Sequence, residues 1–240
     1  LAAAPAGSEL AAEYYGAMCA AINFAWVNRQ LIMHRTRQVF ERVFDRDWRD
    51  MEMDLLYDVA HNIAKREVHD VPVDGSGEPV VPEEAVDTEE RELFVHRKGA
   101  TRAFPAERMA GTPYAETGQP VLIPGSMGTA SYVLVGTPAS AATYHSVNHG
   151  AGRTMSRSEA AGGRSRRRRS KKDRGREAAI TDDAFKRAMK GITLIAGNRW
   201  AVKEEAPQAY KDIDEVVRVV VDAGLARVVA RMVPLAVLKG

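Results

Sequence analysis

The 240-residue sequence contains a single cysteine, Cys19, and its net charge is only +2. One cysteine cannot form a disulfide within the chain, and it excludes a zinc site built from paired CxxC motifs. No stretch approaches the roughly 20 consecutive apolar residues needed to cross a bilayer, and residues 1–10 lack the basic flank of a signal peptide. We therefore expect a soluble, cytoplasmic protein. Because residue 1 is Leu rather than Met, we also expect the chain to begin part-way into a longer protein.

The small net charge conceals a strongly basic segment. Residues 164–176 contain nine arginines and lysines against one aspartate, which gives this run a charge of +8 and leaves about −6 for the rest. Such a segment has no apolar residues to bury and attracts polyanions such as RNA. We predict a flexible basic insertion over residues 158–180, which either contacts RNA or is a solvated loop without a partner.

Hydrophobic periodicity predicts helices interspersed with short strands. Ser8 can cap a helix that runs to about Phe44, and its apolar positions recur every fourth residue: Leu10, Tyr14, Met18, Ile22 and Trp26. Further helices are predicted near residues 181–190 and 212–223. Strands are predicted at residues 93–95, 121–123, 132–135 and 228–238, and Asp74-Gly75 indicates a hairpin turn. These elements indicate an α+β protein, with a mixed sheet and flanking helices.

Two glycine-containing segments could handle phosphate. In the first, His149 precedes Gly150-Ala151-Gly152 and Arg153, so a nucleophilic imidazole, small residues and a cation come together. The second, residues 124–131 (PGSMGTAS), lies between two predicted strands and offers backbone N–H groups and three hydroxyls. It lacks the GK[ST] ending of a Walker A loop. Taken alone, each segment is equally compatible with an ordinary turn.

A third segment, residues 58–69 (DVAHNIAKREVH), holds His61 and His69. If the segment is helical, these histidines and Lys65 share one face, so a histidine there could ligate a metal. The segment is not HExxH and does not indicate a zinc protease. Structural roles for both histidines remain open.

Together these segments resemble successive blocks of one family, the RtcB-type RNA-splicing ligases. The similar blocks are NFAWVNRQ (23–30), YDVAHNIAKREVH (57–69), VHRKGATRAFP (95–105), TGQPVLIPGSMGTASYVLVG (117–136), NHGAGRTMSR (148–157), EEAPQAYKDIDEVV (204–217) and PLAVLKG (234–240). They follow the family's order, so residues 1–240 resemble the C-terminal part of an RtcB-like ligase domain.

The resemblance implies a GTP- and Mn²⁺-dependent enzyme with nucleotidyltransferase-like chemistry. It would join RNA 2′,3′-cyclic phosphate or 3′-phosphate ends to 5′-hydroxyl ends through a histidine–GMP intermediate, in tRNA splicing or RNA repair. The implied nucleophile is His149, and the implied Mn²⁺ ligand is His61. The implied nucleotide-binding residues are His61, Asn62, Pro124, Gly125, Ser126, Met127, Ser131, His149, Gly150, Ala151, Gly152 and Lys239. We add as candidates for binding RNA phosphates Arg97, Lys98, Arg102, Arg153 and Arg157.

The chain also departs from the family pattern. Family members are about twice as long, and their N-terminal half supplies a metal-bridging cysteine, an acidic ligand and two further histidines. We therefore expect this chain to be inactive alone and to need that missing half, with RNA as substrate and archease as a further partner. The alternative is a truncated, non-catalytic remnant that binds RNA through its basic segment.

Overall fold

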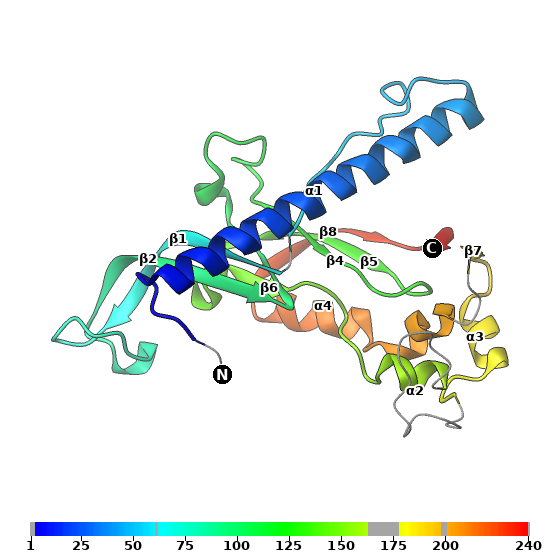
Figure 1. Ribbon diagram of the computed structural model, residues 1–240. Coiled ribbons are helices and arrows are strands. Elements are labelled where there is room, and N and C mark those ends of the chain that lie inside the picture. Colours follow the sequence, from blue (N-terminus) through cyan, green and yellow to red (C-terminus); the bar gives the residue numbers. More distant parts are fainter. Residues whose placement is uncertain (1–2, 61, 163–177, 198–200, 240) are drawn as a thin grey trace. The chain divides into compact units, whose positions relative to one another are not determined.

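The computed structural model describes residues 3–60, 62–162, 178–197 and 201–239 (Figure 1). It divides the chain into two compact units, residues 1–98 and residues 99–240. The predicted basic insertion falls mainly on residues 163–177, which lie outside the described residues. None of the described helices is long and apolar enough to cross a membrane.

The first unit is built from one long helix and one hairpin. Helix α1 spans Glu9–Phe44, 36 residues, and Ser8 caps it by accepting a hydrogen bond from the Ala11 N–H at 3.2 Å. The helix ends where Asp45 adopts a left-handed conformation with φ 51°. The predicted helix from Ser8 to about Phe44 is therefore confirmed (blue in Figure 1).

The hairpin pairs β1 (Asn62–Val73) with β2 (Asp87–Lys98) in an antiparallel register that sets Asn62 opposite Lys98 and Val73 opposite Asp87. The predicted turn begins at Asp74, whose carboxylate accepts hydrogen bonds from the N–H groups of Ser76 and Glu78 at 2.8 and 3.0 Å. A short 3-10 helix, Pro82–Glu84, lies in the same connection.

The helical alternative for the histidine segment is wrong, because residues 62–73 form strand β1. Burial alternates along the strand, with Glu67, His69 and Val71 buried and Arg66 and Val68 exposed. Since strand side chains alternate between faces, this period of two explains the pattern that a helix would not.

The second unit is organised around a three-stranded sheet in the order β4-β5-β8, with all neighbours antiparallel. These strands are β4 (Pro120–Ile123), β5 (Ser131–Gly136) and β8 (Ala226–Met232). The helix α4 (Ile213–Asp222) contributes Ile213, Val217 and Val220 to the same apolar cluster as Val121 and Leu134 of the sheet. Burial of these apolar side chains is what holds the helix to the sheet.

The remaining elements of this unit are short. Two pairs of strands form separate two-stranded sheets, one antiparallel and one parallel: β3 (Ala100–Arg102) with β6 (Ser146–Asn148), and β7 (Thr193–Ala196) with β9 (Ala236–Lys239). The short helices are α2 (Arg157–Ala161) and α3 (Asp182–Ala188), with 3-10 turns at Ala106–Met109, Pro138–Thr143, Ala201–Glu205 and Pro207–Ala209.

The α+β class is confirmed, but the expected mixed sheet is not. The described strands form four small sheets, and none of these combines parallel with antiparallel pairs. The strand predicted at residues 228–238 is two strands, β8 and β9, which belong to different sheets. Pro234 lies between them, and proline cannot donate to a strand ladder.

Candidate functional site

His149 follows directly on strand β6 in the second unit. Its backbone N–H donates to the carbonyl of Gly99 at 3.3 Å, which continues the pairing of Asn148 with Ala100. Gly99 has φ +78°, and a Cβ there would lie 3.8 Å from the His149 ring, an ordinary contact distance. The His149 side chain is half-buried. The short β3–β6 pair therefore fixes the backbone from which this imidazole projects.

The two predicted phosphate segments lie against each other. The Ala151 N–H donates to the Pro124 carbonyl at 3.1 Å, and a Cβ on Gly150 would approach that same oxygen to 3.4 Å. The Asn148 side-chain amide donates to the Gly150 carbonyl at 3.1 Å. The His149 segment thus contacts the loop between β4 and β5, although Ala151 and Pro124 are more than 20 positions apart in the sequence.

The loop of residues 124–131 is held in shape by its own hydroxyl groups. Backbone N–H groups of Gly125, Ser126 and Gly128 donate to the hydroxyls of Ser131, Thr129 and Ser126 at 3.3, 2.7 and 3.3 Å, respectively. An anion could bind these N–H groups only by displacing the hydroxyl oxygens, which could then donate to it.

Glycine is required at the start of this loop. A Cβ at Gly125 would lie 2.0 Å from the Ala130 carbonyl oxygen, which is far inside van der Waals contact. Met127, by contrast, is buried in a small apolar cluster with Met189 and Val202. Its side chain therefore anchors the loop to the unit's interior.

Arg153 is surrounded by acceptors from its own chain. Its Nε donates to the Met155 carbonyl at 3.1 Å, and its two terminal nitrogens donate to the Tyr210 hydroxyl at 3.0 Å and the Glu204 carbonyl at 2.6 Å. The guanidinium also lies 4.9 Å from the centre of the Tyr210 ring. These contacts give Arg153 a structural role, and its RNA contact stays a prediction.

Glu205 connects Arg153, Arg157 and Tyr210. It accepts hydrogen bonds from the Tyr210 hydroxyl and from Arg157 Nε, the latter at 3.0 Å, and lies 3.6 Å from Arg153. Burial raises the pKa of Glu205, but the Tyr210 hydrogen bond and the two arginines outweigh it, so its pKa is lowered. Burial, and next the Glu205 carboxylate, raise the pKa of Tyr210.

Gly152 sets the direction of the backbone between the His149 segment and the group of Arg153, Glu205 and Tyr210. Gly152 has φ +73°, a conformation that favours glycine, and its carbonyl accepts from the Lys211 N–H at 3.0 Å. Glu205, Tyr210 and Lys211 were not among the predicted site residues. They lie over 50 positions after His149, inside the family-like block of residues 204–217, but no local motif marked them as site residues.

Other predicted residues of this unit lie elsewhere in it. Arg102 Nε donates to the Gln119 side chain at 2.9 Å, and its guanidinium lies over the Phe104 ring at 4.3 Å. Lys239 ends strand β9, where it pairs with Ala196 of β7. The pairing that the structure gives for Lys239 is therefore with strand β7, not with His149.

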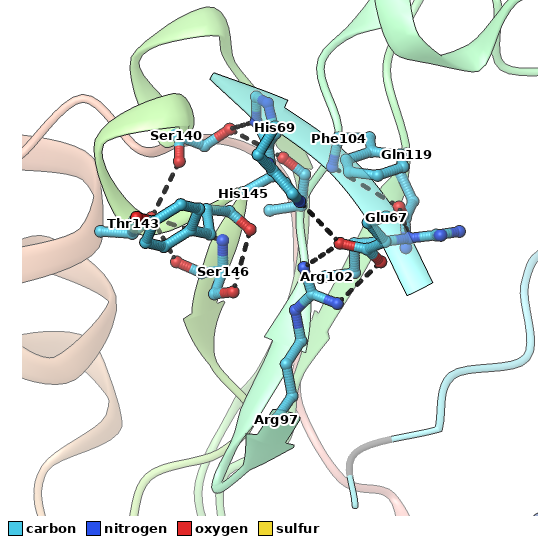
Figure 2. A network of polar contacts seen from close by, with 12 residues as sticks. Glu67, His69, Arg97, Arg102, Phe104, Gln119, Ser140, Thr143, His145 and Ser146 are labelled. Atoms are coloured by element: carbon cyan, nitrogen blue, oxygen red, sulfur yellow. Dashed lines mark hydrogen bonds and ion pairs between the residues drawn. The ribbon is translucent and has the colours of Figure 1, made fainter. Parts of the chain in front are cut away.

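In the first unit, Arg97 is one of the most deeply buried side chains, with 2% of its surface exposed. Its terminal nitrogens donate to both carboxylate oxygens of Glu67 at 2.9 and 2.8 Å, and His69 Nε2 lies 3.0 Å from that carboxylate (Figure 2). Two parallel hydrogen bonds are the strongest arrangement for such a pair. This geometry favours a structural role for Arg97.

The metal prediction rests on residues that are only partly described. His61 lies outside the described residues, and Asn62 and Lys98 face each other at the open end of the hairpin, where both are exposed. Across the described ranges, no group of three histidine, cysteine, aspartate or glutamate side chains could hold a metal ion. The residues that the structure describes therefore do not form a complete metal site by themselves.

Comparison with known proteins gives a clear assignment. A family model described as "tRNA-splicing ligase RtcB" matches residues 1–240. A relative named tRNA-splicing ligase RtcB from Thermococcus kodakarensis is 48% identical over 246 residues, and the match covers 100% of this chain and 44% of that protein. Proteins of the same name from Aeropyrum pernix and Pyrococcus abyssi are 44% and 46% identical, with 100% of this chain and 44% and 23% of those proteins covered.

The family model thus matches the whole length of this α+β chain, in which the His149 segment contacts the glycine-containing loop of residues 124–131. The chain belongs to the RtcB family. It spans less than half the length of the curated relatives that it matches.

Proposed function

We propose that this chain is the nucleotide-handling part of an RNA ligase in which His149 accepts GMP from GTP. One observation carries the proposal: the Ala151 N–H donates to the Pro124 carbonyl at 3.1 Å, so the histidine segment and the hydroxyl-rich loop form one surface. The names of the relatives, tRNA-splicing ligase RtcB, support RNA as the substrate.

The proposed chemistry begins with a neutral His149 imidazole. A ring nitrogen attacks the α-phosphorus of GTP, a P–N bond forms, and pyrophosphate leaves as the P–O bond breaks. Gly150 carries no side chain, so the backbone of this segment can approach the phosphate closely. Loop N–H groups of Gly125, Ser126 and Gly128 would stabilise charge after their hydroxyl partners turn toward the anion.

GMP would then pass from His149 to an RNA 3′-phosphate, formed by opening a 2′,3′-cyclic phosphate. Attack by the 5′-hydroxyl of the second RNA end would release GMP and seal the strand. Arg157, with 66% of its side chain exposed, and the exposed Lys98 are suited to contact RNA phosphates. We propose tRNA halves or broken RNAs as substrates, a cytoplasmic location, and archease as a partner.

Manganese remains part of the proposal through family resemblance alone. His61 would be one ligand, and the other ligands would come from the part of the ligase outside this chain. In the complete enzyme, Mn²⁺ would neutralise the triphosphate. Since a site with one protein ligand binds a metal poorly, we expect the 240-residue chain alone to bind Mn²⁺ weakly by calorimetry.

The proposal is tested in a complete enzyme. In a chimera, this chain would replace the matching 44% of the Thermococcus kodakarensis relative. Labelled GTP and Mn²⁺ should give an acid-labile, base-stable adduct, because a P–N bond hydrolyses in acid, and His149→Ala should abolish it. The control is His34→Ala, which removes an exposed histidine of α1. An adduct that persists in the His149→Ala chimera would exclude this histidine as the nucleophile.

A further inference from the structure

Helix α1 uses one of its faces to pack within the first unit. The Tyr15 ring meets the Phe94 ring edge-on at 5.3 Å, and the Ala64 N–H donates to the Met18 sulfur at 3.3 Å. Ile22 is buried, and Arg29 forms a hydrogen-bonded ion pair with Asp58 at 2.6 Å. These contacts follow positions 15, 18, 22 and 29, spaced three, four and seven residues apart, so they mark one side of the helix.

A second apolar surface follows a different side of the same helix. We call it the outer stripe, and its members are Leu10, Tyr14, Ala17, Ala21, Phe24 and Leu31. From Leu10 to Phe24 the spacing alternates between four and three residues. Asn28 takes the next place on this face, and Leu31 follows three residues later, so the face is continuous along the helix. All six are exposed; Phe24 exposes 77%, Leu10 63% and Leu31 56% of its surface.

A cavity of about 550 Å³ lies at the beginning of the outer stripe. It is lined by Leu10 and Tyr14 of the stripe, by Tyr15, and by Phe94 and His96 of strand β2. Its lining is mostly apolar, and it belongs entirely to the first unit. A large side chain from a partner could fill this cavity while the partner covers the stripe.

A helix with apolar residues on two faces is typical of one that lies between two layers of protein. For α1, the β1–β2 hairpin supplies one layer. The relatives contain enough further polypeptide to form a second layer, since this chain matches only 44% of the proteins from Thermococcus kodakarensis and Aeropyrum pernix. An apolar stripe of this kind left in water is a liability that natural proteins cover.

We propose that the outer stripe of α1 is a docking surface for the portion of an RtcB-family ligase that lies outside this chain. The portion meant is the polypeptide of the longer relatives that the 240 residues do not match. It would cover Phe24 and Leu31 and insert an apolar side chain into the cavity beside Leu10. This inference rests on family membership and exposed surface, and is independent of the chemistry proposed for His149.

Site-specific thiol labelling tests the proposal in the chimera and in the 240-residue chain. In a Cys19→Ser background, Leu31→Cys places a thiol on the outer stripe, and Gln30→Cys places one on the next residue, rotated by about 100° around the helix. Leu31 and Gln30 are both exposed in this chain. Mass spectrometry of peptides would give the maleimide labelling rate at each position, and no GTP or RNA is needed.

We expect labelling of the Leu31→Cys thiol to be about ten-fold or more slower in the chimera than in the 240-residue chain, because reaction then requires local opening. The rate at Gln30→Cys should be similar in both proteins. Equal rates at Leu31→Cys would overturn the proposal. So would protection that grows with the concentration of the 240-residue chain alone, because a second copy would then be the occupant.

A second measurement guards against local damage by the cysteine. Phe24→Glu should lower the thermal midpoint of the chimera but leave that of the 240-residue chain nearly unchanged, since Phe24 is in water there. Gln30→Glu, which adds the same charge, should affect neither protein. Equal effects of Phe24→Glu on the two proteins would contradict the proposed docking. Guanylylation lost without any change in Leu31→Cys protection would instead bear on the role of His149.

Discussion

The buried pair of Glu67 and Arg97 allows a quantitative prediction. Only 4% and 2% of the two side chains are exposed, and two hydrogen bonds of 2.9 and 2.8 Å join them. The Glu67→Gln variant keeps the size of the side chain but removes the carboxylate charge that pairs with the buried Arg97 guanidinium. Removing one partner of a buried ion pair costs about 3–5 kcal/mol. With a urea dependence of about 2 kcal/mol per M, the midpoint should fall by roughly 2 M.

The assay is urea unfolding of the 240-residue chain, followed by circular dichroism. Glu92→Gln is a matched control on the same hairpin, because the ion pair of Glu92 with Arg66 has more than half of each side chain exposed. Its midpoint should hardly move. The double variant Glu67→Leu, Arg97→Met should recover part of the lost stability, since the buried arginine charge is removed together with the carboxylate, while His69 loses its contact with Glu67. Additive losses in the double variant, or a negligible effect of Glu67→Gln, would refute this reasoning.

Gly125→Ala should lower the free energy of unfolding by about 1–3 kcal/mol in urea, because its Cβ would meet the Ala130 carbonyl. The lowered pKa of Glu205 means that its ionised form stabilises the fold at neutral pH and that this contribution is lost as pH falls through the lowered value. Stability curves of wild type and Glu205→Gln should therefore converge in acid. Deleting residues 164–176 should make the log–log salt slope of RNA binding shallower by about two to four units, from three to five lost phosphate contacts.

Each of these three predictions has a control or a result that would contradict it. Gly16→Ala, in an open part of α1, should stabilise the chain by about 0.5–1 kcal/mol, so a loss there would point to a general effect of alanine. A Glu205→Gln difference that grows in acid would reverse the assigned sign. An unchanged salt slope would make the basic segment a solvated insertion.

Local signals predicted those elements that begin at a capping or turn residue. Ser8 and Thr181 cap the helices that begin after them, and Asp74 opens the hairpin turn, because each depends only on residues within about four positions. The helical periodicity was more misleading at α1. Steps of four residues drift by about 40° each, so of the apolar positions that recur every fourth residue, Leu10 and Tyr14 are exposed while Ile22 is buried.

Long-range features could not be predicted from the sequence in the same way. Positions 61, 65 and 69 are four residues apart, and this spacing places them on one face of a helix. The same spacing also places them on one face of a strand, so it cannot distinguish the two structures. Pairing with β2, which residues 62–73 alone do not encode, decides between the two. The contact of Ala151 with Pro124 and the meeting of Arg153 with Glu205 likewise depend on chain segments far apart.

The self-bonded loop of residues 124–131 has a thermodynamic consequence for any anion that it binds. Its N–H groups already point toward hydroxyl oxygens of Ser126, Thr129 and Ser131, so the loop is ordered before a ligand arrives. The conformational entropy of fixing that backbone is lost on folding and need not be lost again on binding. Binding should therefore exchange one set of hydrogen bonds for another, with a small entropic cost and an enthalpy that reflects the stronger bonds to a charged acceptor.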